Sequence, residues 1–128
     1  MNQDQPRLEG TKLANFTPTG PVTELQVIDL AEGTGPVVPE GATVTAHYTG
    51  ALCQDGTIFQ SSHDFGQAIS FPLSGVIEGW TKGVPGMKVG GTRRLVIPAA
   101  MAYGSQSPSA NIPANSDLVF DIELTAVR

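Results

Sequence analysis

Short runs in which polar and apolar residues alternate dominate the chain from residue 23 onward. The clearest covers residues 43–49, where Val44, Ala46 and Tyr48 share one face and the threonines and His47 share the other. A period of two is typical of a half-buried β-strand. The same reasoning predicts strands over residues 23–30, 69–73, 92–97 and 117–127, the last with Phe120 on its apolar face.

A β-hairpin is predicted where Asp55 and Gly56 separate two apolar runs. This dipeptide favours a two-residue turn, in which both central positions adopt positive φ. The strand that follows, starting at Thr57 and containing Phe59, is therefore expected to run antiparallel to the strand before the turn.

One short helix is predicted over residues 74–84. Ser74 is placed as its N-cap, Trp80 lies on its apolar stripe, and Pro85 with Gly86 ends it. Residues 98–116 form a long loop rich in Pro, Ser and Asn, and a loop of this length in a small domain is more often functional than idle. The expected class is therefore α+β, with a strongly bent antiparallel sheet of five to six strands around one short α-helix.

The composition changes this picture mainly at the N-terminus. With 128 residues, of which 40% are hydrophobic, the chain is long enough for one domain, and 15 glycines with 10 prolines exclude a helical bundle. Residues 1–21 contain few large apolar side chains, so we expect a flexible tail from which Leu13 and Phe16 rest on the domain. The domain itself is expected to cover residues 22–128.

Charge and cysteine content exclude several classes of partner. The formal net charge is -5, so a nucleic-acid backbone would be repelled, and we expect no nucleic-acid partner. Cys53 is the only cysteine, which rules out an intrachain disulfide and a cysteine-rich zinc site. No apolar run reaches the length of a membrane span. We expect a cytoplasmic monomer, although an exported protein whose leader has been removed would look the same.

The sequence offers little for nucleophilic, metal or nucleotide chemistry. Ser61, Ser62, His63 and Asp64 contain the residue types of a catalytic triad, but sequence neighbours rarely meet its geometry, and polar turn residues are the favoured interpretation. Metal and phosphate-loop motifs are not found, and no cofactor is expected. What remains is a set of aromatic residues near turns, which form either the core or the wall of a cleft: Tyr48, Phe59, Phe71, Trp80, Tyr103 and Phe120.

Several motifs in the same order resemble the FK506-binding-protein family of peptidyl-prolyl isomerases. They are His47-Tyr48-Thr49-Gly50, Asp55-Gly56-Thr57-Ile58-Phe59, Val76-Ile77-Glu78-Gly79-Trp80, Gly86-Met87-Lys88-Val89-Gly90-Gly91, and Ala102-Tyr103-Gly104 followed by Leu118-Val119-Phe120-Asp121. The resemblance extends over residues 23–128. It implies cis/trans isomerisation of peptide bonds before proline, with proline-containing polypeptides as substrates and FK506- or rapamycin-type macrolides as further ligands.

The resemblance also implies a set of site residues. The proline ring would sit on Trp80, while the N–H of Ile77 and the hydroxyl of Tyr103 would bind carbonyl groups. By motif position the catalytic set is Tyr48, Phe59, Gln60, Trp80, Tyr103 and Phe120, and the substrate-binding set is Ile69, Phe71, Val76, Ile77 and Ile112. The family usually has Asp at the position of Gln60, so a carboxylate is lost and reduced activity is expected.

Two other functions compete with an active isomerase. The first is a binding module of the same fold that holds proline segments with weak or no turnover, for which Gln60 is the main argument. The second is a chaperone that holds unfolded chains, which is not favoured because the sequence has no large insertion between Tyr103 and Phe120.

Overall fold

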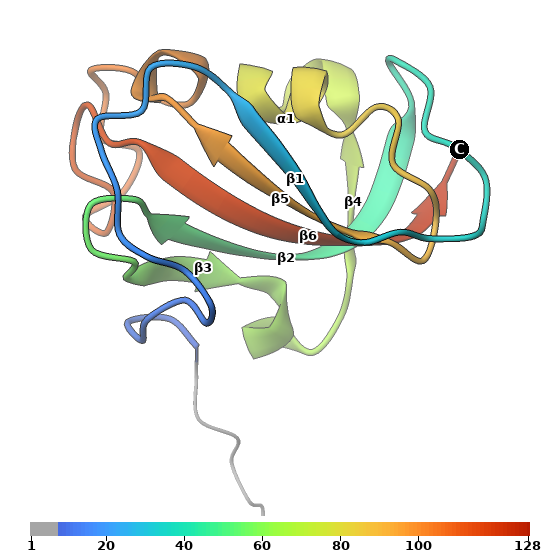
Figure 1. Cartoon of the computed structure of the whole chain (residues 1–128), viewed down its shortest axis with the longest axis horizontal. Helices are drawn as coiled ribbons and strands as arrows, with labels where there is room; N and C mark the ends of the chain where they lie inside the picture. The colour runs from blue at the N-terminus through green and yellow to red at the C-terminus, as the bar shows by residue number, and fades with distance from the viewer. Residues whose placement is uncertain (1–7) are drawn as a thin grey trace, which may run out of the picture.

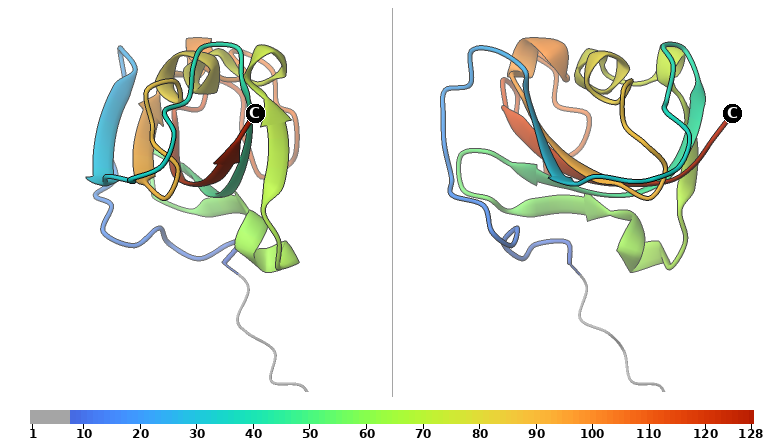
Figure 2. Two further views of the ribbon diagram at one scale, coloured as in Figure 1. Left: turned by 90° about the vertical axis from the view of Figure 1, so that its right-hand side faces the viewer. Right: turned by 45° about the vertical axis from the view of Figure 1, so that its right-hand side comes forward.

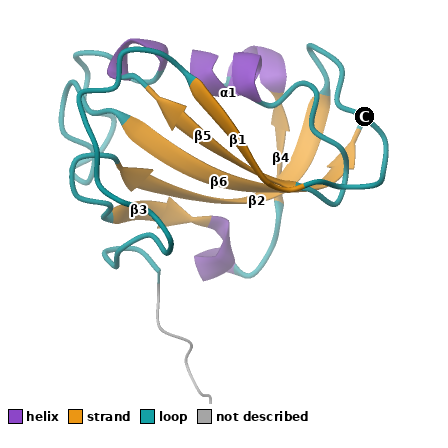
Figure 3. Cartoon of the chain, viewed as in Figure 1, coloured by secondary structure: helices purple, strands orange, loops and turns teal. Residues whose placement is uncertain are grey.

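The computed structural model describes residues 8–128 as a bent antiparallel sheet with one α-helix (Figure 1). Strands account for most of the regular structure (Figure 3). The strands are β1 (Gln26–Ala31), β2 (Thr43–Leu52), β3 (Ile58–Ser61), β4 (Ile69–Pro72), β5 (Thr92–Ile97) and β6 (Leu118–Val127), and the helix is α1 (Glu78–Gly83). The expected α+β class is confirmed. Among residues 8–128, no helix has the length and apolar character needed to cross a bilayer.

The order of strands explains how the sheet curves around the helix. The six-stranded sheet runs β1-β5-β6-β2-β3, and β4 also pairs with β2. The first half of β2 pairs with β4 and the second half with β3, so that this long strand belongs to both arms of the bend. Figure 2 shows the resulting curved sheet with α1 on its concave side. Tyr48 lies in the middle of β2, and its ring contacts that of Trp80 on the helix.

The hydrophobic core lies between the concave face and α1. A helix of six residues has little stability of its own and depends on packing. Gly79 makes this packing close, because a Cβ atom at that position would lie only 2.5 Å from the Cδ1 atom of Ile97 on β5. The helix backbone therefore rests directly on the sheet, and the next residue, Trp80, points into the centre of the core.

The predicted start of the helix is wrong. Residues 73–75 form a separate 3-10 turn, and α1 begins after Ile77, whose side chain makes no capping hydrogen bond. Val76 and Ile77 are extended instead of helical, in keeping with the low helix propensity of β-branched residues. Ser74 therefore does not cap α1. The hydroxyl of Thr81 ties the two pieces together by donating to the carbonyl of Leu73 at 2.7 Å.

The hairpin between β2 and β3 is present, but its turn differs from the prediction. Residues 53–57 connect the two strands, and Gly56 has a φ of 77° while Asp55 does not take a positive φ. The Asp55 carboxylate accepts a hydrogen bond from the N–H of Thr57 at 2.9 Å. Such a local side-chain bond stabilises a longer turn in place of the two-residue one.

The convex face of the sheet is covered by the N-terminal segment, defined here as residues 8–22. Leu13 and Val22 are buried there in a second hydrophobic cluster with Ala51, Cys53, Ile58, Val96 and Val119. Arg94 on β5 reaches across to this segment and donates to the carbonyls of Asn15 at 2.8 Å and Ala14 at 3.1 Å. The segment thus packs on the domain as Leu13 and Phe16 suggested.

Backbone hydrogen bonds also join the N-terminal segment to the outer edge of β3. The N–H of Gly10 donates to the carbonyl of Ile58 at 2.7 Å, and the N–H of Ile58 donates to that of Thr11 at 2.8 Å. Residues 1–7 of the expected tail lie outside the described residues, and the flexibility of the tail stays a prediction.

Candidate functional site

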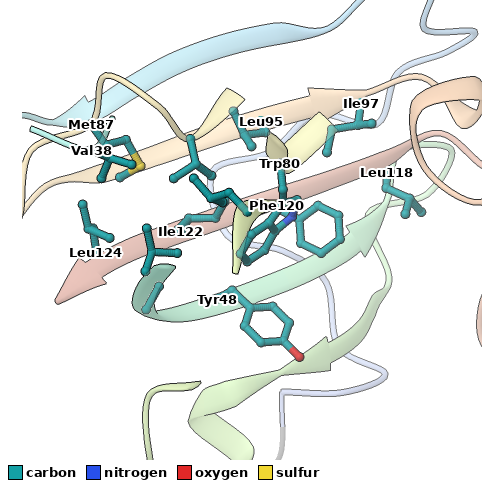
Figure 4. Packing of buried hydrophobic residues seen from close by; sticks show 14 of the residues in the cluster. Val38, Tyr48, Trp80, Met87, Leu95, Ile97, Leu118, Phe120, Ile122 and Leu124 are labelled. Carbon is teal, nitrogen blue, oxygen red and sulfur yellow. The ribbon is translucent and has the colours of Figure 1, made fainter. Parts of the chain in front are cut away.

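Five aromatic rings meet edge to face between β2, β3, β4, β6 and α1. Trp80 is at the centre, with its ring centroid 5.1 Å from that of Phe71, 5.5 Å from Phe120 and 5.7 Å from Tyr48. Figure 4 shows Trp80, Phe120 and Tyr48 side by side. Phe59 completes the group at 5.7 Å from Phe120. Edge-to-face contacts of this kind fix the orientation of each ring.

These rings form the floor and walls of an open cavity of about 300 Å³. Its lining consists of Tyr48, Phe59, Gln60, Phe71, Gly75, Val76, Ile77, Trp80, Tyr103 and Phe120. Trp80 is only 4% exposed, yet its indole borders the cavity, so it belongs both to the core and to the cavity lining. The volume is at the lower end of small-molecule sites, and suits a ring as small as that of proline.

The closeness of two of the rings depends on a glycine beneath them. A Cβ atom at Gly50 on β2 would lie 2.6 Å from Phe59 and 2.7 Å from Phe120. Any larger residue at this position would therefore displace these rings.

The rim carries the polar groups that could bind a carbonyl. Among residues 8–128, none accepts a hydrogen bond from the N–H of Ile77, which lines the cavity next to α1. Tyr103 lies in the long loop, and is 38% exposed. Burial, with a smaller effect from Tyr103, raises the pKa of Tyr48 above its ordinary value, so its hydroxyl stays protonated at neutral pH. None of the described residues lining the cavity is a carboxylate, an imidazole or a basic side chain.

Gln60 lies at the exposed edge of the cavity, where the resemblance implies the loss of a carboxylate. In the described part of the chain, its side chain forms no hydrogen bond with Tyr48. An amide in this place keeps an acceptor but carries no charge. The electrostatic contribution of this residue to the site is therefore smaller than that of an aspartate.

The structure brings most of the predicted site residues together. The cavity lining contains all six residues of the predicted catalytic set, together with Phe71, Val76 and Ile77. Ile112 belongs to the hydrophobic core and Ile69 packs against it. Neither is part of the lining, and their contact with a substrate stays a prediction. Gly75 lines the cavity although it was not predicted. Gly75 could have been predicted to line the cavity, because it directly precedes Val76 and Ile77 in the sequence.

The group of triad-like residue types has structural roles. The Ser61 hydroxyl accepts from the N–H of His63 at 3.3 Å, and the Ser62 hydroxyl accepts from the N–H of Tyr48 at 2.8 Å. The rings of His47 and His63 are stacked at 4.3 Å, and His63 lies 3.2 Å from Glu123. No nucleophile faces the aromatic cavity from this group.

Comparison with known proteins identifies relatives over most of the chain. The profile of the family described as FKBP-type peptidyl-prolyl cis-trans isomerase matches residues 35–125. The probable FK506-binding protein of Corynebacterium glutamicum is 44% identical over 108 residues, which cover 84% of this chain and 91% of that protein. The peptidyl-prolyl cis-trans isomerase FPR2 of Saccharomyces cerevisiae is 48% identical over 90 residues, covering 69% of this chain and 67% of the relative.

Solved structures show the same fold. FkpA from Escherichia coli matches with a TM-score of 0.73 and 41% identity, covering 81% of this chain, which spans 48% of the FkpA chain. AtFKBP13 matches with a TM-score of 0.71 and 36% identity, covering 81% of this chain and 93% of the other.

Proposed function

Because the chain belongs to the family of FKBP-type peptidyl-prolyl cis-trans isomerases, we propose that its aromatic cavity accelerates rotation about peptide bonds before proline in polypeptide substrates. The observation that supports this role for the cavity is the open hollow bordered by the Trp80 indole. A proline ring placed on the indole would be held by apolar contacts on several sides. The bond before it would remain at the mouth of the cavity.

The chemistry of the cavity fits a reaction that needs no nucleophile. Amide resonance sets a rotation barrier of about 18 to 20 kcal/mol, and the planar amide is more dipolar than the twisted one. An apolar, aromatic lining therefore binds the twisted form better than the planar form, which is the condition for lowering the barrier. About 6 to 8 kcal/mol of such selective stabilisation corresponds to an acceleration of roughly 10⁴- to 10⁶-fold.

Two polar groups on the rim would orient the peptide. The N–H of Ile77 would donate to the carbonyl of a residue next to the proline, and the Tyr103 hydroxyl would donate to a second carbonyl. Both groups lie at the cavity, and within the described residues the Ile77 N–H has no other acceptor. Fixing one end of the peptide leaves rotation to the other end. We propose the same two groups and the same rings as the binding site for FK506- and rapamycin-type macrolides.

A protease-coupled assay on a proline tetrapeptide tests this function directly. The expected result is faster cis-to-trans conversion than in buffer, with inhibition by FK506 or rapamycin. A conversion rate equal to that in buffer would exclude catalysis. Activity without inhibition would leave the isomerase intact but overturn the proposed macrolide site.

A binding module with weak turnover is the second candidate, and Gln60 is the observation that favours it. In the Gln60→Asp variant a carboxylate returns to the rim of the cavity. If the parent is mainly a binding module, kcat/KM should rise more than about tenfold in this variant, whereas a change within about threefold is expected for an active isomerase. Gln60→Glu, with a longer side chain, is the control for added charge alone.

The monomeric state and the cytoplasmic location expected from the sequence stay predictions. Sedimentation velocity would test the first of them.

A further inference from the structure

A second hollow lies next to the aromatic cavity and shares Phe59 with it. Its volume is about 440 Å³, and it is lined by Glu9, Gly10, Thr57, Ile58, Phe59 and Asn111. Phe59 borders both spaces. The two are therefore neighbours, and a chain that leaves one across Phe59 enters the other.

The wall of this hollow is held in place by several hydrogen bonds. The Glu9 carboxylate accepts from the side-chain amide of Asn111 at 2.7 Å, which joins the N-terminal segment to the long loop. The N–H groups of Leu8 and Glu9 donate to the carboxylate of Asp64, at 2.8 and 3.1 Å. The paired backbone of Gly10 and Ile58 holds the same wall to β3. The hollow is thus bounded by segments that contact one another through specific bonds.

The lining of the second hollow differs in chemistry from that of the aromatic cavity. It presents a carboxylate, a side-chain amide and a hydroxyl beside the apolar surface of Ile58 and Phe59. The Glu9 carboxylate and the Asn111 amide nitrogen bond to each other, and the Thr57 hydroxyl accepts from Lys12. An extended polypeptide would therefore meet mainly the apolar surface of Ile58 and Phe59 here, with the side-chain carbonyl of Asn111 as an acceptor for its N–H groups. Two of the lining residues, Glu9 and Gly10, precede the region of the family profile, which begins at residue 35. This subsite is therefore built in part from a segment outside the matched region.

We propose that this hollow is a second subsite, which takes the residues that flank the proline of a polypeptide substrate. The inference rests on the proposed function of the aromatic cavity. Successive residues of an extended chain are about 3.3 to 3.6 Å apart, so a few residues beyond a proline seated on Trp80 suffice to cross Phe59. Substrates with several residues on each side of the proline gain contacts here that a tetrapeptide is too short to make.

The kinetic test compares a proline tetrapeptide with a decapeptide that has proline at its centre. Asn111→Trp fills the hollow from an exposed loop position, and Ala110→Trp adds the same bulk one residue earlier, at an exposed position outside the lining. In Asn111→Trp the ratio of decapeptide to tetrapeptide kcat/KM should fall about fivefold, since a few lost subsite contacts commonly change specificity by this order. Ala110→Trp should keep the parental ratio. An unchanged ratio in Asn111→Trp, or equal losses in both variants, would overturn the subsite.

A binding measurement separates failure of the subsite from failure of the isomerase. In ¹H–¹⁵N spectra of the full chain, the decapeptide should shift the amide signals of Gly10 and Thr57, and the tetrapeptide should leave them in place while shifting that of Ile77. Shifts confined to the aromatic cavity with both peptides would exclude the subsite even if the enzyme is active. A parent that binds both peptides in this pattern but turns over neither would retain the subsite and refute the proposed catalysis.

Discussion

The two faces of the sheet hold the segments that cover them through different kinds of interaction. On the concave face, α1 and the aromatic rings pack through apolar contacts around an open cavity. On the convex face, the N-terminal segment is held by a small apolar cluster, by backbone hydrogen bonds and by Arg94, which donates to its carbonyls and is itself paired with Asp121. Both faces are built from the same strands: in β6, Phe120 points to the cavity, and Asp121 to the convex side.

This difference separates catalysis from attachment of the N-terminal segment. The inner rings pack in the core and line the cavity proposed to bind the substrate, so their loss should affect folding and activity together. The outer contacts supply stability without touching the reacting bond. Substitutions on the two faces should therefore be distinguishable by the activity that each folded variant retains.

The largest effect is expected for Trp80→Ala. Removing the central ring should lower the free energy of unfolding by about 4 kcal/mol, because the indole is buried and touches three other rings. The kcat/KM of the folded fraction should also fall by about 100-fold, since the proline ring loses the indole on which it would pack. Urea denaturation and the protease-coupled assay measure the two losses, with Trp80→Phe as the milder control. Full activity in Trp80→Ala would disprove the pocket assignment.

Breaking the ion pair on the convex face should affect stability alone. The Nε and Nη2 atoms of Arg94 contact the two carboxylate oxygens of Asp121 at 2.6 and 2.8 Å, with the Arg94 side chain only 9% exposed. Arg94→Met leaves the carboxylate without its partner and should cost about 3 kcal/mol of unfolding free energy.

A double-mutant cycle checks this interpretation of the pair. Adding Asp121→Leu to Arg94→Met should recover part of the loss, since no uncompensated charge remains. The tetrapeptide kcat/KM of both variants should stay within about twofold of the parent, as neither residue lines the aromatic cavity. A large loss of activity in folded Arg94→Met would show that the faces are not independent.

A smaller loss is expected where the N-terminal segment inserts a single apolar side chain. Leu13 is 8% exposed and packs in the outer cluster. Leu13→Ala should lower the free energy of unfolding by about 2 kcal/mol through the lost apolar contact. Leu8→Ala, at a partly buried position of the same segment, is the matched control with a smaller expected loss. Equal stability of Leu13→Ala and the parent would mean that the segment does not stay packed in solution.

The smallest effect is a dependence of stability on alkaline pH. Burial, together with the charge of Asp117, raises the pKa of the Cys53 thiol from 9.0 to about 12. Below pH 9 the thiol is protonated in both states, and stability does not change; above it the unfolded chain ionises first, so stability falls as pH rises towards 12. Between pH 9 and pH 10 the free energy of unfolding should fall by ~1 kcal/mol, which is less than the loss expected for Leu13→Ala. Urea titrations at several pH values measure this pH dependence, and Cys53→Ala should flatten it; the same slope in both proteins would contradict this origin.

Strong periodicity made much of the fold predictable. The strand predicted over residues 92–97 matches β5 at its observed bounds, and the alternation over residues 43–49 gave the inward direction of Tyr48 on β2. Local rules were less reliable. Ser74 looked like a helix cap, but Val76 and Ile77 stay extended, and their side chains line the cavity. Tertiary packing, and not a local capping residue, therefore determines where α1 begins.

The site was predictable because its rings come from ordered family motifs, whereas the second hollow was not. Its formation depends on Glu9 meeting Asn111, 102 positions later in the chain, and on Gly10 pairing with the edge of β3. Neither contact leaves a periodic or compositional trace. The polar composition of the N-terminal segment predicted a flexible tail. Composition could not predict its contacts with β3, because backbone hydrogen bonds to a strand edge do not require apolar side chains.

The pairing of residues 10–12 with β3 has a consequence for the protein in a crowded solution. The free side of an outer strand is a template on which a neighbouring molecule can add its own strand and start a polymer. Here the N–H and C=O groups of Ile58 are already bonded to Thr11 and Gly10. The beginning of the chain thereby shields this side of the sheet from self-assembly, and a shortened protein starting at residue 14 would lose that shield.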